Sequence, residues 1–215
     1  MKDIVIYGAG GLGREVACLI RAINQTYSQW NLLGFIDDGL SVGTKVSHYG
    51  EVLGGKQFLL KLNKPMSVVI SIGSPSVVKE IVSDLLVNTC IDFPNLIYPS
   101  LRFADAETFE IGKGNIIKHD CGFSCDIKIG NFNLLNGGVV FGHNVEIGDF
   151  NTFMPDVRIS GEVKIGDGNF FGVGAIVLQQ IKIDKDVKLG AASVMMRKPK
   201  NGELYMGNPA KIIKF

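Results

Sequence analysis

The sequence lacks several features that would assign it to a particular class of protein. Its 215 residues carry a formal net charge of +1, so no basic field argues for nucleic-acid binding. No run of about eighteen apolar residues is present, so no membrane span is predicted. Glycine interrupts residues 1–13 where a secretory signal would need its apolar stretch, and we therefore expect a cytoplasmic protein.

Cysteine and histidine are also scarce. The four cysteines lie in a chain with 46% apolar residues, which has no need of disulfide staples, and reduced thiols are expected. A metal site could be considered at His119, Cys121 and Cys125. The spacing of these residues is not that of a zinc motif, so no metal is predicted.

Residues 1–98 alternate strand patterns with helix patterns. Apolar runs predict strands at 4–7, 32–36, 68–72 and 95–98, and apolar residues at helical spacing predict helices at 12–23 and 77–86. Strands that alternate with helices indicate a parallel sheet. The prediction for this first half is a Rossmann-like α/β domain.

The remaining residues, 99–215, follow a different rhythm. Every sixth residue from Ile111 to Met195 is apolar, and a period of six fits neither a simple strand nor a helix. It fits a parallel β-helix whose triangular coil uses three hexapeptides. The alternative is a set of unrelated short strands in a β-sandwich.

A coil of eighteen residues makes a second pattern meaningful. The motif Ile-Gly-x-x-Asn occurs at 111–115, 129–133, 147–151 and 165–169, always eighteen residues apart. Stacked isoleucines would fill one interior corner, and stacked asparagines would form an amide ladder. We expect the glycines to adopt turn conformations that other residues avoid. The exposed ends and flat faces of such a helix call for a cap and for partner chains.

The motif Gly8-x-Gly10-x-x-Gly13 follows the first predicted strand and opens the first helix. Glycines there let backbone N–H groups approach a diphosphate at the positive end of a helix. Asp37 and Asp38 end the second strand, where a carboxylate can accept hydrogen bonds from ribose hydroxyls. NAD is one candidate ligand. A domain of about 98 residues is only half of a dinucleotide fold, however. The loop can also be read as a turn that merely packs helix on strand.

The hexapeptide repeats, the glycine-rich opening and the closing Gly207-Asn208-Pro209-Ala210-Lys211 together resemble bacterial sugar acyltransferases of the NeuD and PglD type. The resemblance covers nearly the whole chain. It implies a left-handed β-helix, a homotrimer with active sites between neighbouring helices, acetyl-coenzyme A as acyl donor and a nucleotide-activated sugar as acceptor. By the same resemblance, six residues would contact the sugar nucleotide: Gly10, Gly11, Leu12, Asp37, Asp38 and Gly73. Leu12 stands where some relatives have histidine.

Acyl transfer from a thioester to an amine or hydroxyl needs a base, and neutral histidine titrates in the useful range. His48 is expected in a loop, whereas His119 and His143 both follow inward-pointing residues and should point outward. His143 matches the family's His-x-x-x-Ile-Gly segment, so the resemblance makes it the catalytic base. His119 lies twenty-four residues earlier and is predicted on a different edge.

Two neighbouring positions depart from the family pattern. Asn144 stands where relatives often have an acid directly after the histidine, and an amide offers no full charge to an imidazolium. Either another carboxylate serves His143, or this base is weaker. Thr152 stands where several relatives have a second histidine. By resemblance the donor contacts are Thr152, Gly161, Val173 and Ala191.

The repeat patterns predict an α/β domain at 1–98 and a β-helix at 99–215. The resemblance implies a sugar O- or N-acetyltransferase with His143 as base and Asn144 beside it. One alternative is an acetyltransferase of a free small molecule such as serine or an antibiotic. Another is a β-helix that binds or scaffolds without catalysis.

Overall fold

The computed structural model describes residues 1–214 and contains two compact units, Met1–Pro99 and Ser100–Phe215. The predicted ranges were 1–98 and 99–215. The first unit is α/β, and the second is a left-handed parallel β-helix, so the predicted fold class is confirmed.

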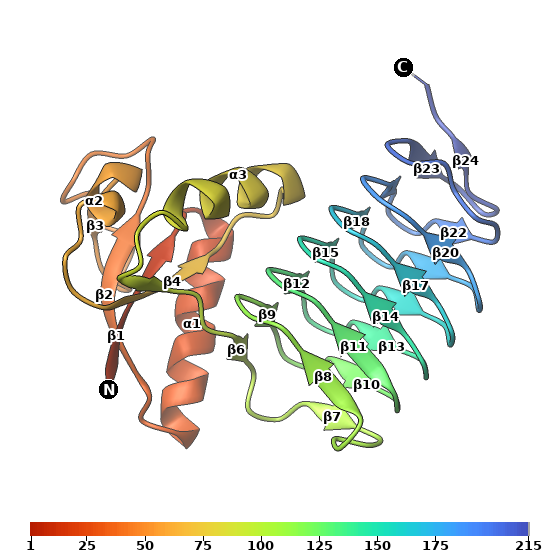
Figure 1. Ribbon diagram of the computed structural model, residues 1–215, viewed down its shortest axis with the longest axis horizontal. Helices are drawn as coiled ribbons and strands as arrows, with labels where there is room; N and C mark the ends of the chain where they lie inside the picture. The colour runs from red at the N-terminus through yellow and green to blue at the C-terminus, as the bar shows by residue number, and fades with distance from the viewer. Residues whose placement is uncertain (215) are drawn as a thin grey trace. The chain divides into compact units, whose positions relative to one another are not determined.

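The first unit contains a five-stranded parallel sheet in the order β3-β2-β1-β4-β5. Its strands are β1 (Lys2–Tyr7), β2 (Trp30–Ile36), β3 (Val52–Gly54), β4 (Met66–Ile70) and β5 (Ile91–Asp92), and its helices are α1 (Gly11–Thr26), α2 (Lys56–Leu60) and α3 (Pro75–Leu85). Figure 1 shows α1 on one side of the sheet and α2 with α3 on the other. The strand order reverses between β1 and β4, and parallel sheets bind ligands at such a switch point.

Both predicted helices of this unit and three of its predicted strands are present. β1 and β4 form because uninterrupted apolar runs bury both faces of a central strand, and Ile4, Val5 and Val68 are fully buried. The predicted strand at 95–98 exists as β6 (Leu96–Ile97), but it is not one of the five strands of this sheet. The sheet's last strand is β5 instead. The short elements β3 and α2 were missed, since three and five residues are too few to show a period.

The second unit stacks short strands on three faces, which rise as successive coils in Figure 1. Face 1 contains β7 (Arg102–Phe103), β10 (Gly122–Phe123), β13 (Val140–Phe141), β16 (Arg158–Ile159), β19 (Ile176–Val177) and β22 (Val194–Met195). Face 2 contains β8 (Phe109–Ile111), β11 (Ile127–Ile129), β14 (Glu146–Ile147), β17 (Lys164–Ile165) and β20 (Lys182–Ile183). Face 3 contains β9 (Ile116–Ile117), β12 (Leu134–Leu135), β15 (Thr152–Phe153), β18 (Phe170–Phe171), β21 (Lys188–Leu189), β23 (Leu204–Met206) and β24 (Lys211–Ile212).

Paired strands in the repeats are eighteen residues apart, as the predicted coil requires. Ile129 pairs with Ile147, which pairs with Ile165. Of the fifteen predicted inward residues, all are buried except Ile111, which is half-buried in the first coil. Stacked side chains fill the interior, and the rings of Phe153 and Phe171 lie 4.7 Å apart. Strand β24 runs antiparallel to β23 and so ends the parallel stack.

The predicted asparagine ladder is present. The Nδ2 atoms of Asn133, Asn151 and Asn169 each donate to Oδ1 of the asparagine one coil before, at 3.0 Å. Each ladder oxygen also accepts a backbone N–H from the next coil, for example that of Asn151 at 2.8 Å. The ladder therefore satisfies buried polar groups without water.

The repeat glycines were predicted to adopt turn conformations that other residues avoid, and this prediction was wrong. Gly112, Gly130, Gly148 and Gly166 do not occupy left-handed conformations. A Cβ at Gly166 would lie 1.8 Å from the carbonyl oxygen of Asp184, so the close approach of the next coil requires glycine. The left-handed residues come two positions later, and at Phe132 and Phe150 they are not glycines.

Candidate active site

His143 lies on the corner between faces 1 and 2, which we call corner 2. Its Nδ1 lies 2.9 Å from Oδ1 of Asn144, the residue that follows it. An amide oxygen only accepts, so this contact assigns the proton to Nδ1 and leaves the lone pair on Nε2. The side chain is exposed. The ring is thus oriented with its basic nitrogen available.

Gly161 lies one coil after His143 and directly against its ring. A Cβ at Gly161 would lie 2.6 Å from Nε2 of His143. Any larger residue at this position would have to displace the imidazole. Gly161 therefore fixes where the ring can sit.

Corner 2 also contains a carboxylate that the sequence reasoning did not name. Glu162 lies eighteen residues after Asn144, and its backbone N–H donates to the carbonyl oxygen of His143 at 2.8 Å. Hydrogen bonds from Gln180 and Gln179 and the charge of His143 hold the pKa of Glu162 below its usual value. The available signal was the eighteen-residue count, applied to Asn144 instead of to the histidine.

His119 occupies the corner between faces 3 and 1, which we call corner 1. Its Nδ1 lies 2.9 Å from Oδ2 of Asp120. A Cβ at Gly137, one coil later, would lie 2.7 Å from Cε1 of His119. The local arrangement repeats that of His143, with a carboxylate in place of the amide.

The predicted donor residues are divided between different parts of the β-helix. Gly161 lies at corner 2, whereas Val173 and Ala191 lie on consecutive coils at corner 1. Val173 is 47% exposed, and its carbonyl oxygen accepts the N–H of Ala192 at 2.8 Å. Thr152 is buried on face 3. One chain does not bring these four residues together.

The N-terminal glycine-rich loop lies at the switch point of the sheet, at the carboxyl ends of β1 and β4. A Cβ at Gly13 would lie 2.1 Å from the carbonyl oxygen of Gly8, so the close packing of α1 on the loop requires glycine. No described atom lies within 4 Å of a Cβ built at Gly10, Gly11 or Gly73. These three glycines therefore border open space, with the N-terminus of α1 beside them.

Asp37 and Asp38 both bind within their own unit. Oδ2 of Asp37 accepts the N–H of Ala9 at 2.9 Å, which ties the glycine-rich loop to the end of β2. Asp38 accepts the hydroxyl proton of Tyr7 and, at 2.7 Å, the N–H of Lys56. Burial and the Asp38 carboxylate raise the pKa of Tyr7. Burial alone would raise the pKa of Asp38, but the bonds from Tyr7 and Lys56 lower it.

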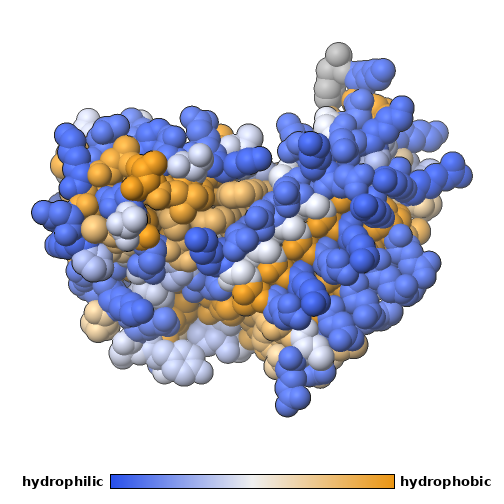
Figure 2. Space-filling view, in the orientation of Figure 1, coloured by the Kyte–Doolittle hydropathy of each residue, from blue (hydrophilic) through white to orange (hydrophobic). Residues whose placement is uncertain are grey.

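Face 2 is lined by alternating charges. Lys128 pairs with Glu110 at 2.9 Å, and Lys164 pairs with Glu146 at 2.8 Å. A groove of about 720 Å³ lies on this face, and none of the predicted site residues lines it. Figure 2 shows hydrophilic side chains around an apolar stripe on the β-helix. Exposed pairs of this kind add little stability.

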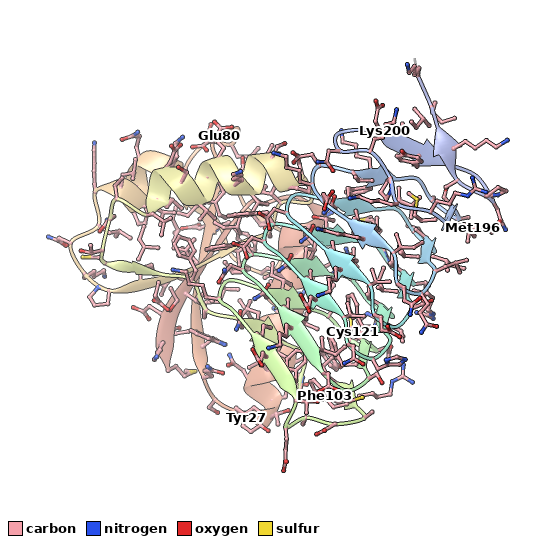
Figure 3. All side chains as sticks on the ribbon, turned by 45° about the vertical axis from the view of Figure 1, so that its right-hand side comes forward. Tyr27, Glu80, Phe103, Cys121, Met196 and Lys200 are labelled. Carbon is pink, nitrogen blue, oxygen red and sulfur yellow. The ribbon has the colours of Figure 1, made fainter. Side chains whose placement is uncertain are left out.

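Cys121, labelled in Figure 3, is buried within the β-helix beside His119. Burial raises the pKa of its thiol to about 11, and the thiol contacts the carbonyl oxygen of Asn136 at 3.2 Å. Among residues 1–214 no group of three or more His, Cys, Asp or Glu side chains is placed to hold a metal ion. The same residues include no helix long and apolar enough to cross a membrane.

Comparisons with known proteins agree with this architecture. Residues 3–85 match the family model described as the PglD N-terminal domain. Among solved structures, WeeI from Acinetobacter baumannii AYE is 29% identical with a TM-score of 0.87, over 99% of this chain and 100% of that one. The acetyltransferase domain of PglB from Neisseria gonorrhoeae FA1090, in complex with acetyl coenzyme A, is 24% identical with a TM-score of 0.87, over 99% of both chains.

PerB from Caulobacter crescentus, in complex with CoA and GDP-perosamine, is 22% identical with a TM-score of 0.85, over 100% of this chain and 98% of that one. No curated protein sequence matches the chain.

The molecule therefore consists of a hexapeptide-repeat left-handed β-helix preceded by an α/β domain with a parallel sheet. Residues 3–85 of its N-terminal unit match the PglD N-terminal domain, which agrees with the resemblance drawn from the sequence.

Proposed function

We propose that the protein transfers an acetyl group from acetyl-coenzyme A to an amino or hydroxyl group of a nucleotide-linked sugar, with His143 as general base. The main support for this proposal is that His143 begins the segment His143-x-x-x-Ile147-Gly148, whereas the similarly oriented His119 does not. Nδ1 of His143 faces Asn144 at 2.9 Å, and Nε2 keeps a lone pair that can accept the acceptor's proton. The PglB domain and PerB, which share the fold, are described with acetyl coenzyme A and with CoA and GDP-perosamine.

The reaction needs few protein groups. The acceptor nitrogen or oxygen attacks the thioester carbonyl while Nε2 of His143 takes its proton, and the coenzyme A thiolate leaves and recovers a proton. The backbone N–H of Gly161 is the proposed donor to the oxyanion that develops on the carbonyl. No covalent enzyme intermediate is required, since the base acts on the acceptor itself.

The separation of the donor residues supports an oligomeric site. His143 and Gly161 lie at corner 2, while Val173 and Ala191 lie at corner 1, across face 1 of the same prism. They can act on one acetyl-coenzyme A only if corner 1 of a second copy faces corner 2 of the first. A homotrimer with three equivalent grooves meets this condition. The small residues at corner 1 leave room for a pantetheine arm, and a Cβ built at Gly174 meets no neighbouring atom within 4 Å.

The first unit is the proposed site for the sugar nucleotide. Gly10, Gly11 and Gly73 border open space at the switch point, where helix N-termini favour a diphosphate. Asp37 and Asp38 already hold internal hydrogen bonds, but each carboxylate oxygen has a second lone pair for a ribose hydroxyl. Leu12, the sixth proposed contact, is half-buried beside them.

Two assays test this function separately. Release of the coenzyme A thiol from acetyl-coenzyme A would be followed with GDP-perosamine, other amino-sugar nucleotides, free serine and aminoglycoside antibiotics. Turnover with a nucleotide sugar is expected, and turnover only with free serine or an antibiotic would favour the small-molecule alternative. Absence of turnover with every compound tested would favour the alternative of a β-helix that binds or scaffolds without catalysis.

A ligand screen tests the first unit. Thermal unfolding would be measured with UDP, dTDP, GDP and CMP sugars and with NAD. A nucleotide sugar present at about one hundred times its Kd should stabilise the protein by about 2.7 kcal/mol. Stabilisation by NAD alone would overturn the assignment of the glycine-rich loop. The expected cytoplasmic location can be tested by fractionation of cells that express the protein.

A further inference from the structure

The neutral amide beside His143 cannot balance the positive charge that the imidazole gains when it takes a proton. A general base becomes an imidazolium during proton transfer, and a nearby carboxylate stabilises that cation. Asn144 orients Nδ1 but has no charge to offer. A carboxylate elsewhere on corner 2 would fill this role.

Corner 2 presents one column of left-handed residues, eighteen positions apart. Asp126, Asn144, Glu162 and Gln180 have φ values of 58°, 57°, 61° and 65°. Asn144 and Glu162 are thus equivalent positions on adjacent coils. The coil of Glu162 is also the one whose Gly161 lies against the His143 ring.

The carboxylate of Glu162 is held in place from the coil beyond. Nε2 of Gln179 donates to its Oε1 at 2.9 Å, and Nε2 of Gln180 donates to its Oε2 at 3.0 Å. Its backbone N–H is bound to the carbonyl oxygen of His143 at 2.8 Å. A long, exposed side chain is thereby restrained at the same corner as the base, on the next coil.

The geometry points to Glu162 as the positioning residue that supplies the negative charge for His143, one coil away from its usual place directly after the histidine. This inference rests on the proposed function of His143. Glu162 would not touch the reacting atoms, and it would act by stabilising the protonated ring. The carboxylate of Glu162 would supply the charge that the amide of Asn144 lacks.

The charges around the ring agree with this assignment. Hydrogen bonds from Gln180 and Gln179 and the charge of His143 lower the pKa of Glu162, so it is an anion throughout the range in which histidine titrates. The other ionisable groups on the neighbouring turn are Cys125 and Asp126, on the coil before. Asp126 occupies the same column on the opposite side of Asn144, which makes it a matched control.

The test follows the titration of the His143 ring by NMR, in the full-length protein and without substrate. The His143→Ala variant would assign the signal. Glu162→Gln should move the titration midpoint to lower pH by roughly half a unit, because the imidazolium loses a stabilising charge near the protein surface. Glutamine suits this backbone position, since Gln180 has the same conformation one coil later. Asp126→Asn should move the midpoint by clearly less.

Two further readouts separate a charge effect from a folding effect. Glu162→Gln should lower the plateau of kcat/KM by about threefold to tenfold, and the acidic limb of its pH profile should move to lower pH. Adding Asn144→Asp to Glu162→Gln should restore both, because the charge returns beside the ring. An unchanged midpoint in Glu162→Gln, an equal shift in Asp126→Asn or no restoration by Asn144→Asp would each overturn the assignment.

The titration needs no turnover, so its outcome is independent of the proposed activity. If the titration midpoint of His143 does not shift in Glu162→Gln, the role of Glu162 is rejected and that of His143 as base is unaffected. Full activity in His143→Ala would instead reject the base, whatever Glu162 does to the ring.

Discussion

The two histidine turns of the β-helix are built alike but lie at different corners. His119-Asp120-Cys121 and His143-Asn144-Val145 are twenty-four residues apart, and in both the third residue is fully buried. In both turns Nδ1 contacts the next side chain at 2.9 Å, and a glycine one coil later faces the ring. Local geometry alone therefore does not identify a catalytic histidine in this fold.

What differs is the surroundings of each ring. His119 has the carboxylate of Asp120 directly beside it. His143 has a neutral neighbour, with the restrained carboxylate of Glu162 on the next coil. If charge next to the ring were sufficient, His119 would be the better base. The corner at which a histidine lies therefore has to be tested together with its immediate partner.

Removing each imidazole ring in turn tests which of the two histidines is the base. His143→Ala should lower kcat/KM by about 10²- to 10⁴-fold, the usual contribution of a general base. His119→Ala should leave kcat/KM within about threefold of the parent, since its ring would be an exposed corner residue. Both variants would be assayed by coenzyme A release with the best nucleotide sugar. A large loss in His119→Ala with little in His143→Ala would exchange the two roles.

A smaller effect is expected from the glycines that face the rings. Gly161→Ala would place a Cβ 2.6 Å from Nε2 of His143, and Gly137→Ala would place one 2.7 Å from Cε1 of His119. Neither backbone is in the left-handed region, so the rings must move while the coils stay intact. We expect Gly161→Ala to lower kcat by about tenfold to a hundredfold, because a displacement of about 1 Å spoils proton transfer.

Gly137→Ala is the matched control for that experiment. Its unfolding temperature should resemble that of Gly161→Ala, but its activity should stay near that of the parent. Equal losses of kcat in the two variants would mean that packing of the coils, and not the ring position, limits the reaction.

The β-helix was predictable to the residue because its period is in the sequence itself. Inward positions recur every six residues, and strand partners lie eighteen residues apart. This spacing alone predicts that Ile129, Ile147 and Ile165 stack. The reason for the repeat glycines was not predictable in this way. Sequence spacing does not reveal that the carbonyl oxygen of Asp184 approaches Gly166 from the next coil.

The site was predictable only in part, because its partners come from neighbouring coils. His143 and Asn144 are adjacent in sequence, and their contact is local. Glu162 lies at the same corner on the next coil, nineteen positions after His143, in a column defined by backbone conformation. In the first unit, the short β3 and α2 are determined by tertiary packing, and the sequence contains no periodic pattern that predicts them.

The smallest expected effect concerns the thiols beside the two turns. Cys121 is buried next to His119, with its pKa raised to about 11 by burial, whereas Cys125 is half-buried one coil before His143. The thiolate is the reactive form, so at pH 8 only about one in a thousand Cys121 side chains would be reactive, and the fraction would grow as pH rises toward 11.

Iodoacetamide at pH 8, followed by mass mapping, should label Cys125 well before Cys121. Labelling of Cys121 at the rate of Cys125 would mean that corner 1 opens in solution, and the close likeness of the two turns would then hold only for their backbones.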